Sequence, residues 1–598
     1  MSIKRSTDKD GNTLPFRTLC GHVTDDNNVT LSSKITGFDS LIDEKEDMVD
    51  DAMVESVAYA SATNTISLKN SNNDIVSSVK INNKMEFNVK NVTNATCTFN
   101  RSTRICNIKW TDPSDVVSNG VTLSGWKGTK VVYKIGSAPR SVEDGTLLIN
   151  STTRNQYSSS GYNTTALTDG KVYFFRFFPY GETMVNVTSP CIEVNTTSNA
   201  TIYGIHINGA DSNPATAVTY LEDAIGKNPV GMDYANDEFS WGDWDDTEFF
   251  MPRPCMLKYD GTVDYYLDPT DYTKKADGTA SDIANTSYAG NAMMEWGRNN
   301  RRIWYKIVPD STDPKTADIY FSDLKIDADY RAWSFYDCNN SLRKHFYTPI
   351  YNGSNVSSRL RSLSGQTTLT NTDVSTEWTY IRSNNTAGSL SGDRWFSETY
   401  SDRILITYLL VLLGKSLDIQ TVFGYGYGNS NNSGKINTGT MNDKGLFWGE
   451  NGGTSGVKVF GMENFWGNVN RRVCGYLTDG YTQKFKLTYN NIDGSGSINY
   501  NTDGVGYISQ TGSAIESNAS GYIEGLRYNS SGVVELDGDE LSGGDSIYYC
   551  DKATWNSGKY AVVGGMWNSG KYNGPFYWQL ANASSVSDNA IGSGIAFR

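Results

Sequence analysis

The residues best equipped for chemistry form an acidic run between Asp237 and Glu248, interleaved with aromatic side chains. Carboxylate oxygens are the ligands that Ca²⁺ prefers, and two carboxylates suffice to hydrolyse a glycosidic bond. The spacing does not follow an EF-hand loop, and Trp241 and Trp244 favour an acidic surface loop that is anchored by aromatic residues. The run therefore leaves a solvated loop, a calcium site and a glycosidase pair as alternatives.

Other catalytic signals are weak. His22, His206 and His345 lie far apart in the sequence, and no nucleophile elbow, zinc-protease motif or phosphate-loop motif occurs. The Gly-rich run that starts at Phe423 lacks the lysine of a phosphate loop, so we expect a surface loop there. We therefore expect no catalytic residue, no metal and no cofactor, and a protein that is not an enzyme.

A clearer signal for binding is a hexapeptide, Trp-Asn-Ser-Gly-Lys-Tyr, that occurs at 555–560 and again at 567–572. Tyr and Trp give rigid contact area at low entropic cost, while Asn, Ser and Gly adapt their hydrogen bonds. The apolar residues between the copies predict a buried strand flanked by two loops. Either tryptophan could instead anchor the core. The predicted ligand-binding residues are Trp555, Asn556, Lys559, Tyr560, Trp567, Asn568, Lys571, Tyr572, Tyr577, Trp578 and Asn582.

The elements that must position these residues are mostly strands. Alternating apolar and polar residues predict strands between about 92 and 198, with inward side chains at 106, 108 and 110 and at 131, 133 and 135. Leu167, Gly170 and Tyr173, entering an aromatic strand, resemble the tyrosine corner of fibronectin type III modules, which implies a spacer domain. Two core helices are expected, at 216–225 and at 398–413, the second with Ser397 as N-cap and Gly414 as its stop.

Three motifs carry a resemblance in the C-terminal part. They are a turn at Trp466-Gly-Asn-Val, a strand at Val562-Val-Gly-Gly-Met-Trp567 and a closing Gly594-Ile-Ala-Phe-Arg598. Together they resemble the formylglycine-generating-enzyme-like branch of the C-type lectin fold, and in particular phage and bacterial ligand-binding proteins varied by diversity-generating retroelements. The enzyme branch has Trp-Glu-Trp where this chain has Asn470-Arg-Arg472, and only Cys550 lies near the end, which argues against the enzyme activity.

The resemblance implies that Asn- and Tyr-rich positions near the end are the varied ones. We therefore expect an exposed contact face that holds Asn556, Lys559, Tyr560, Asn568, Lys571, Tyr572, Tyr577 and Asn582. Segments at 203–207, 213–220 and 360–365 also look like parts of phage tail or receptor-binding proteins, and such proteins imply a homotrimer.

Composition limits the partners. The 52 basic and 66 acidic residues leave a net charge of −14, which excludes the cationic field of a non-specific nucleic-acid binder. The apolar run 404–413 is about half the ~20 residues needed to span a bilayer, so no membrane insertion is expected. The eight scattered cysteines are expected to be mostly reduced, and no secretory signal is visible at the start of the sequence.

These observations predict a mainly β, multidomain adhesin: an N-terminal attachment or oligomerisation segment (1–91), a fibronectin type III-like spacer (92–199), a β-rich intermediate part (200–380) and a C-type-lectin-like α+β domain (381–598). The expected function is recognition of a host surface protein or glycan from a phage tail, with the N-terminal segment attached to other tail proteins. The expected location is the virion, after synthesis in the host cytoplasm without a signal peptide. The alternatives are a carbohydrate-active hydrolase that uses the 237–248 acids and a bacterial surface adhesin.

Overall fold

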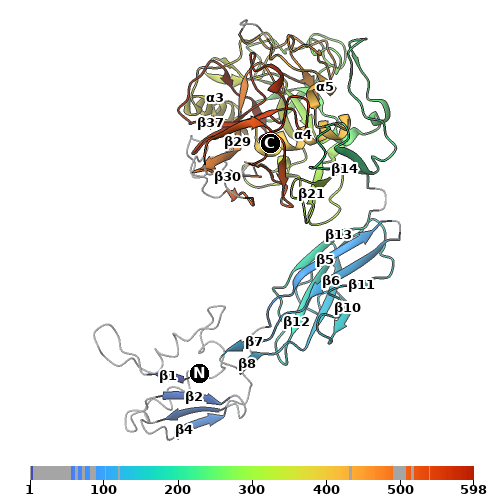
Figure 1. Cartoon of the computed structure of the whole chain (residues 1–598), viewed down its shortest axis with the longest axis vertical. Helices are drawn as coiled ribbons and strands as arrows, with labels where there is room; N and C mark the ends of the chain where they lie inside the picture. The colour runs from blue at the N-terminus through green and yellow to red at the C-terminus, as the bar shows by residue number, and fades with distance from the viewer. Residues whose placement is uncertain are drawn as a thin grey trace, which may run out of the picture. The chain divides into compact units, whose positions relative to one another are not determined.

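The computed structural model describes residues 2–4, 56–60, 65–69, 75–80, 89–101, 103–118, 121–197, 200–429, 434–488, 507–512, 517–537 and 539–598. The chain divides into two compact units, residues 1–198 and 199–598 (Figure 1). Strands far outnumber helices in the described parts, which confirms the prediction of a mainly β, multidomain chain. The predicted attachment segment, 1–91, lies largely outside the described residues.

The described residues of the first unit form three sheets and a short ribbon. One sheet has the order β1 (Ser2–Lys4), β2 (Ser56–Ala60), β3 (Thr65–Lys69) and β4 (Ile75–Lys80). A second has the order β11 (Tyr162–Asn163), β6 (Ile105–Thr111) and β5 (Thr93–Asn100), and a third β10 (Thr146–Ser151), β9 (Gly128–Ile135), β12 (Val172–Tyr180) and β13 (Cys191–Asn195). The ribbon joins β7 (Val116–Ser118) to β8 (Val121–Ser124).

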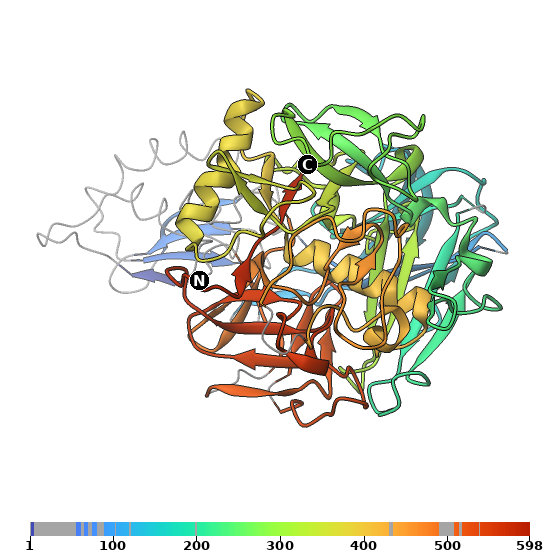
Figure 2. The ribbon, with the colours of Figure 1, turned by 90° about the horizontal axis from the view of Figure 1, so that it is seen from above.

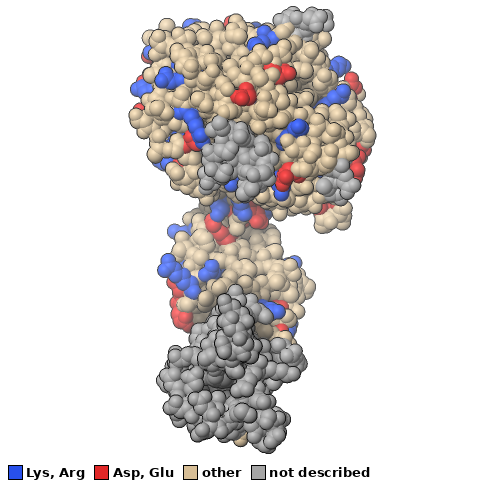
Figure 3. Space-filling model, turned by 90° about the vertical axis from the view of Figure 1, so that its left-hand side faces the viewer, with Lys and Arg blue, Asp and Glu red and all other residues tan. Residues whose placement is uncertain are grey.

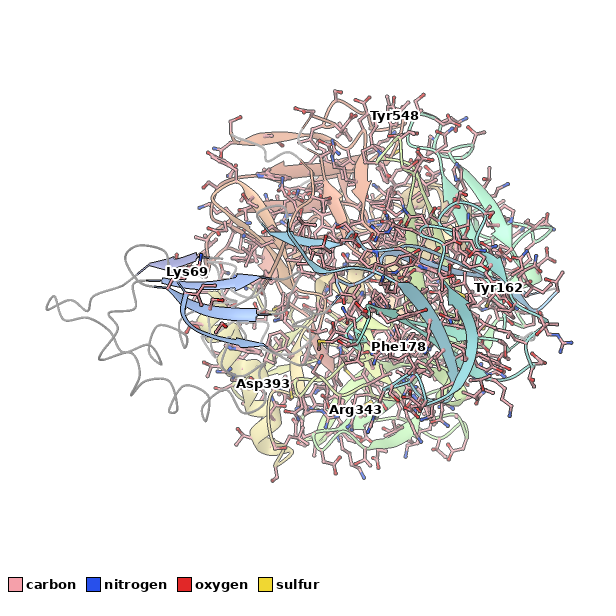
Figure 4. All side chains as sticks on the ribbon, turned by 90° about the horizontal axis from the view of Figure 1, so that it is seen from below. Lys69, Tyr162, Phe178, Arg343, Asp393 and Tyr548 are labelled. Carbon is pink, nitrogen blue, oxygen red and sulfur yellow. The ribbon has the colours of Figure 1, made fainter. Side chains whose placement is uncertain are left out.

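The second and third of these sheets share one hydrophobic core. Strand β6 contributes the buried residues predicted at 106, 108 and 110, and β12 contributes Phe175 and Phe177 (Phe178 and Tyr162 of the same sheets are labelled in Figure 4). The inward series predicted on β9 is wrong at its end, because Ile135 is 48% exposed. The Tyr173 hydroxyl accepts a hydrogen bond from the Thr168 main-chain nitrogen (3.1 Å), so the expected tie from ring to loop is present.

The second unit is built on three larger sheets (Figure 2). The first has the order β19 (Val263–Tyr266), β18 (Arg253–Lys258), β20 (Gly290–Trp296), β23 (Phe346–Pro349), β39 (Ile595–Phe597) and β26 (Trp395–Ser397). The next has the order β15 (Val218–Glu222), β14 (Ile202–Ile207), β22 (Ala317–Ser322) and β21 (Trp304–Pro309). The largest has the order β31 (Ile508–Ser509), β30 (Thr482–Phe485), β29 (Asn470–Asp479), β36 (Tyr560–Val563), β37 (Trp578–Asn582), β35 (Lys552–Trp555) and β32 (Ala519–Tyr522), with β38 (Ile591–Gly592) paired to β29.

Helices and short ribbons complete the second unit. The α-helices are α3 (Val374–Ala387), α4 (Tyr400–Gly414) and α5 (Ile419–Phe423). The 3-10 turns are η2 (Gly242–Trp244), η3 (Glu248–Phe250), η4 (Arg298–Asn300), η5 (Trp333–Phe335) and η6 (Gly570–Tyr572). The ribbons are β16 (Met232–Asp233) with β17 (Glu238–Phe239), β24 (Ser354–Val356) with β25 (Arg359–Arg361), β27 (Lys458–Val459) with β28 (Met462–Glu463), and β33 (Leu526–Tyr528) with β34 (Val534–Leu536).

The buried helix predicted at 398–413 is confirmed as α4, which is buried on all sides and lies in the middle of the second unit (Figure 2). Its N-cap is Thr399 and not Ser397, because Ser397 ends strand β26 and Thr399 forms a reciprocal capping box with Asp402. Gly414 is the last residue of the helix, and the left-handed Lys415 (φ 49°) caps it. Among the described residues, no helix is long and apolar enough to cross a membrane.

The helix predicted at 216–225 is wrong. Residues Val218–Glu222 form β15 and pair antiparallel with β14. The β-branched Val218 and Thr219 suit a strand, and the Asp223 side chain then accepts a hydrogen bond from the Ile202 main-chain nitrogen (2.8 Å). This bond fixes the turn that follows the strand, so tertiary pairing overrides the helical spacing.

Residues 199–598 form one unit, whereas two parts were expected. The expected boundary between 380 and 381 falls inside α3, and β39 at the C-terminal end pairs with β23. Buried ion pairs also connect distant segments: Arg472 of β29 to Glu377 of α3 (2.5 Å), and Arg598 to Asp402 of α4. The two units divide between 198 and 199, and the expected boundary lies between 199 and 200.

Candidate functional site

The two copies of the hexapeptide lie at opposite ends of β36. The strand between them is buried, as predicted, and pairs antiparallel with β37 so that Tyr560 faces Asn582 while Val563 faces Trp578. The first copy therefore shares one end of the strand with Asn582, and the second copy shares the other end with Tyr577. Four strand residues span about 13 Å, so the eleven predicted binding residues divide between two places.

The first copy is largely structural. Trp555 is fully buried, and Tyr560 is 1% exposed and accepts a hydrogen bond from Arg472 Nε (2.9 Å). Burial raises the pKa of the Tyr560 hydroxyl. The Thr478 main-chain nitrogen donates to the Lys559 carbonyl (2.7 Å) and the Gly558 nitrogen donates to the Gly480 carbonyl (2.9 Å), which holds the rest of this loop against the β29–β30 turn. The expectation that Tyr560 lies on an exposed contact face is wrong, because its ring and hydroxyl complete the packing around Arg472.

Two further predicted contact residues are also buried. Trp578 packs in the core with its ring 5.1 Å from that of Tyr476, so its predicted role in binding is wrong. Tyr577 is 5% exposed, so the expected exposure is wrong here as well. The ring of Tyr577 nevertheless stacks beneath that of Tyr572, with centroids 6.1 Å apart. Tyr577 thus supports the second copy without facing solvent.

The second copy forms a fixed turn with projecting side chains. Its Ser569 and its neighbour Asn573 are buried; Ser569 Oγ accepts from the Met566 main-chain nitrogen (3.1 Å) and Asn573 Nδ2 donates to the Met566 carbonyl (3.2 Å). Asn568 and Lys571 are exposed, as expected, and Trp567 and Tyr572 are partly exposed. Small polar residues therefore hold the turn, and the larger ones are presented to solvent.

A glycine-rich floor lies below this turn. The run that starts at Phe423 was expected on the surface but is mostly buried, because it passes under the Trp466-Gly-Asn turn. A Cβ on Gly426 (φ 69°) would lie 2.8 Å from the Trp466 ring, and the Gly428 carbonyl accepts from the Gly570 main-chain nitrogen (2.9 Å). Position 426 therefore requires glycine, and the bond from Gly570 to Gly428 holds the second copy of the hexapeptide directly against the glycine-rich run.

A buried carboxylate fastens the turn from the side. Asp551 is 2% exposed and accepts from the Phe576 main-chain nitrogen (2.8 Å) and from Gln420 Nε2 (2.7 Å). The same Gln420 amide donates to the Lys571 carbonyl (2.9 Å). Burial raises the pKa of Asp551 well above its ordinary value. Helix α5 and the turn are thus joined through one polar network.

Lysines and tyrosines from three other segments surround the second copy. Lys552 faces Tyr522 across the β35–β32 pair, and its Nζ lies 4.8 Å from the Tyr522 ring and 4.5 Å from the Tyr572 ring. Lys571 Nζ lies 6.0 Å from the Tyr425 ring. We call Tyr425, Tyr522, Lys552, Asn568, Lys571 and Tyr572 the lysine–tyrosine face.

Three residues of this face, Tyr425, Tyr522 and Lys552, were not predicted from the sequence. The alternation in β35 was a usable signal, because Lys552 and Thr554 lie on one face of the strand while Ala553 and Trp555 are buried on the other. Nothing local to Tyr522 or Tyr425 indicates that either ring meets a lysine. Tyr548, between these segments, donates its main-chain nitrogen to the Ser212 carbonyl (2.8 Å; labelled in Figure 4).

The acidic run at 237–248 is divided among separate partners. Asp237 accepts from Trp448 Nε1 (2.6 Å), Asp243 from Asn228 (2.8 Å) and Glu248 from Asn299 (2.8 Å). Within the described part of the chain, no cluster of three or more His, Cys, Asp or Glu side chains could hold a metal ion. The arrangement matches the solvated-loop alternative, with Trp244 buried as the anchor.

The two histidines in described parts have structural surroundings. His206 lies on β14 with Nδ1 2.8 Å from Asp318 Oδ1, and His345 packs beside Tyr347. His22 lies outside the described residues.

Comparison with the known protein families finds no family model that matches the chain, and none of the curated proteins matches it.

Proposed function

We propose that the chain is a receptor-binding adhesin whose second hexapeptide and its neighbours, the lysine–tyrosine face, contact the ligand. The observation that carries the proposal is the contrast between two identical hexapeptides. In the first copy Trp555 and Tyr560 are buried in the core, and the exposed residues are Ser557 and Gly558. The second copy holds Asn568 and Lys571 exposed on a turn fastened by buried polar residues. A rigid turn with adaptable polar tips and aromatic rings suits recognition, because little entropy is lost on binding.

The same proposal includes a fibronectin type III-like fold for the spacer and a C-type-lectin-like fold for the C-terminal part. A three-stranded and a four-stranded sheet around one core, with the Tyr173 tie, support a fibronectin type III-like spacer. The Trp466-Gly-Asn turn beneath the second hexapeptide supports a C-type-lectin-like platform in residues 381–598. On this reading the adhesin is a homotrimer at a phage tail, outside the cell, and its N-terminal segment attaches to other tail proteins. Multivalency would then strengthen weak individual sites.

The test is adsorption of the purified full chain to a panel of bacterial cells. Asn568→Trp places a bulky neutral side chain on the exposed second copy, and Ser557→Trp places the same side chain on the exposed part of the first copy. We expect Asn568→Trp to reduce adsorption at least tenfold and Ser557→Trp to leave it within twofold. Equal adsorption of the two variants and the wild type would refute the proposed site.

A further inference from the structure

The lysine–tyrosine face presents two ammonium groups that have no counter-ion among the described residues. Neither Lys552 nor Lys571 forms an ion pair with any residue that the structure describes. Two other lysines over aromatic rings do have a carboxylate partner: Lys444, 4.8 Å from the Trp448 ring, pairs with Asp237 at 3.2 Å, and Lys306, over Tyr330, pairs with Asp327 at 3.0 Å. The charge on the face is therefore available to a ligand.

The rings hold these ammonium groups at the surface. Lys552 lies between the rings of Tyr522 and Tyr572, and a ring face attracts a cation without neutralising its charge. Tyr572 is in turn stacked on the buried Tyr577. Asp545 is exposed and is near enough to contribute to the raised pKa of Tyr522, whose main cause is burial, yet it forms no ion pair with Lys552. Both lysines are thereby ordered before a ligand arrives.

The rest of the molecule would not attract an anion. The chain carries a net charge of −14, and charged side chains of both signs are scattered over the side of the molecule that Figure 3 shows. Long-range attraction of an anion is thus unfavourable, and binding must come from contacts within about one Debye length, roughly 10 Å at 0.1 M salt. In such a chain Lys552, 4.5 Å from the Tyr572 ring, and Lys571, next to Tyr572 in the sequence, form a local cationic site.

We propose that the ligand of this face is an acidic polysaccharide, whose carboxylates meet Lys552 and Lys571 while its sugar rings lie against the tyrosines. The inference rests on the proposed function and names its ligand class. A polysaccharide fits better than a protein surface because lysine is depleted at the centre of protein–protein interfaces. The exposed Asn568 amide can donate to and accept from sugar hydroxyl groups.

The experiment measures binding of the full chain to immobilised alginate, a polyuronate, with neutral dextran as the reference. We expect binding to alginate alone, weakened when NaCl is raised from about 0.05 to 0.5 M. Lys552→Gln and Lys571→Gln should each weaken binding about three- to fivefold, and together about tenfold or more. The matched control is Lys444→Gln, an ion-paired lysine over a tryptophan ring, which should leave binding unchanged.

The outcomes separate this inference from the proposed function. If alginate does not bind at low salt, or if Lys444→Gln weakens binding as much as the double variant, the ligand class is refuted. Adsorption to cells that is sensitive to Asn568→Trp would then leave the proposed function standing. Loss of cell adsorption after protease treatment, with the surface polysaccharide intact, would overturn the inference in favour of a protein ligand. If alginate binding depends on both lysines while Asn568→Trp leaves cell adsorption unchanged, the anionic site stands and the proposed function fails.

Discussion

Removing one hydroxyl from each copy of the hexapeptide tests whether identical sequences have different structural roles. The Tyr560 hydroxyl accepts from Arg472 Nε at 2.9 Å, and both side chains are buried. The other guanidinium nitrogens of Arg472 are bonded to Glu377 and to the Thr372 and Val586 carbonyls, so Tyr560→Phe leaves only the Nε–H without its partner. A hydrogen bond to a charged group contributes about 1.5–3 kcal/mol, so we expect a loss of about 2 kcal/mol in the free energy of unfolding.

The matched change is Tyr572→Phe. The Tyr572 hydroxyl makes no hydrogen bond with a residue in the described parts of the chain, so its removal should cost no more than about 0.5 kcal/mol. Urea unfolding, followed by tryptophan fluorescence, measures both variants. With an m-value of about 3 kcal/mol/M, the midpoint should fall by ~0.7 M for Tyr560→Phe and by less than ~0.2 M for Tyr572→Phe. Equal shifts, or a larger one for Tyr572→Phe, would refute the division of roles.

Three further predictions concern polar groups that stabilise each unit internally. Glu377→Gln breaks the fully buried pair with Arg472 and should cost about 3–5 kcal/mol in urea unfolding. Asp393→Asn breaks the partly exposed pair with Arg382, which lies on the same helix as Glu377, and should cost at most about 1 kcal/mol; similar costs would contradict the burial argument. Because the folded-state pKa of Asp551 is raised, its contribution to stability is complete below its unfolded pKa of about 4 and is lost as the pH rises through the folded value. Between pH 4 and pH 7 the urea midpoint of the wild type should therefore fall relative to that of Asp551→Asn. Parallel pH profiles of the two proteins would disprove this. Tyr173→Phe should lower the stability of the 1–198 unit by about 1 kcal/mol in thermal unfolding, because it removes the hydroxyl that accepts from the Thr168 nitrogen. Tyr133→Phe should leave the stability unchanged, because the Tyr133 hydroxyl makes no hydrogen bond with a described residue. Equal effects of the two changes would count against a stabilising role for the Tyr173 hydrogen bond.

Local patterns predicted those parts of the fold whose partners lie nearby in the sequence. The alternation at 106–110 and the capped apolar helix at 398–413 are properties of the segments themselves. The segment at 216–225 has helical spacing too, yet its strand depends on β14 and on the bond from Ile202 to Asp223. Similarly, the glycine-rich run was expected on the surface because nothing in it reveals that Trp466 covers it.

The candidate site shows the same limit more sharply. Two identical hexapeptides cannot be distinguished by any local pattern, so the sequence could indicate a binding surface without saying which copy forms it. The difference comes from distant residues: Arg472 buries Tyr560 in the first copy, and Gln420 and Gly428 hold the second copy at the surface. The pairing of Lys552 with Tyr522 was missed because it depends on the contact between β35 and β32.

Adsorption of the full chain to bacterial cells, compared between Asn568→Trp and Ser557→Trp, tests the central claim most directly. Both changes add the same side chain to an exposed position of the same hexapeptide, so a general effect of the added ring would appear in both variants. We predict at least a tenfold loss of adsorption for Asn568→Trp and less than a twofold change for Ser557→Trp. A loss confined to Ser557→Trp, or no loss in either variant, would contradict this prediction.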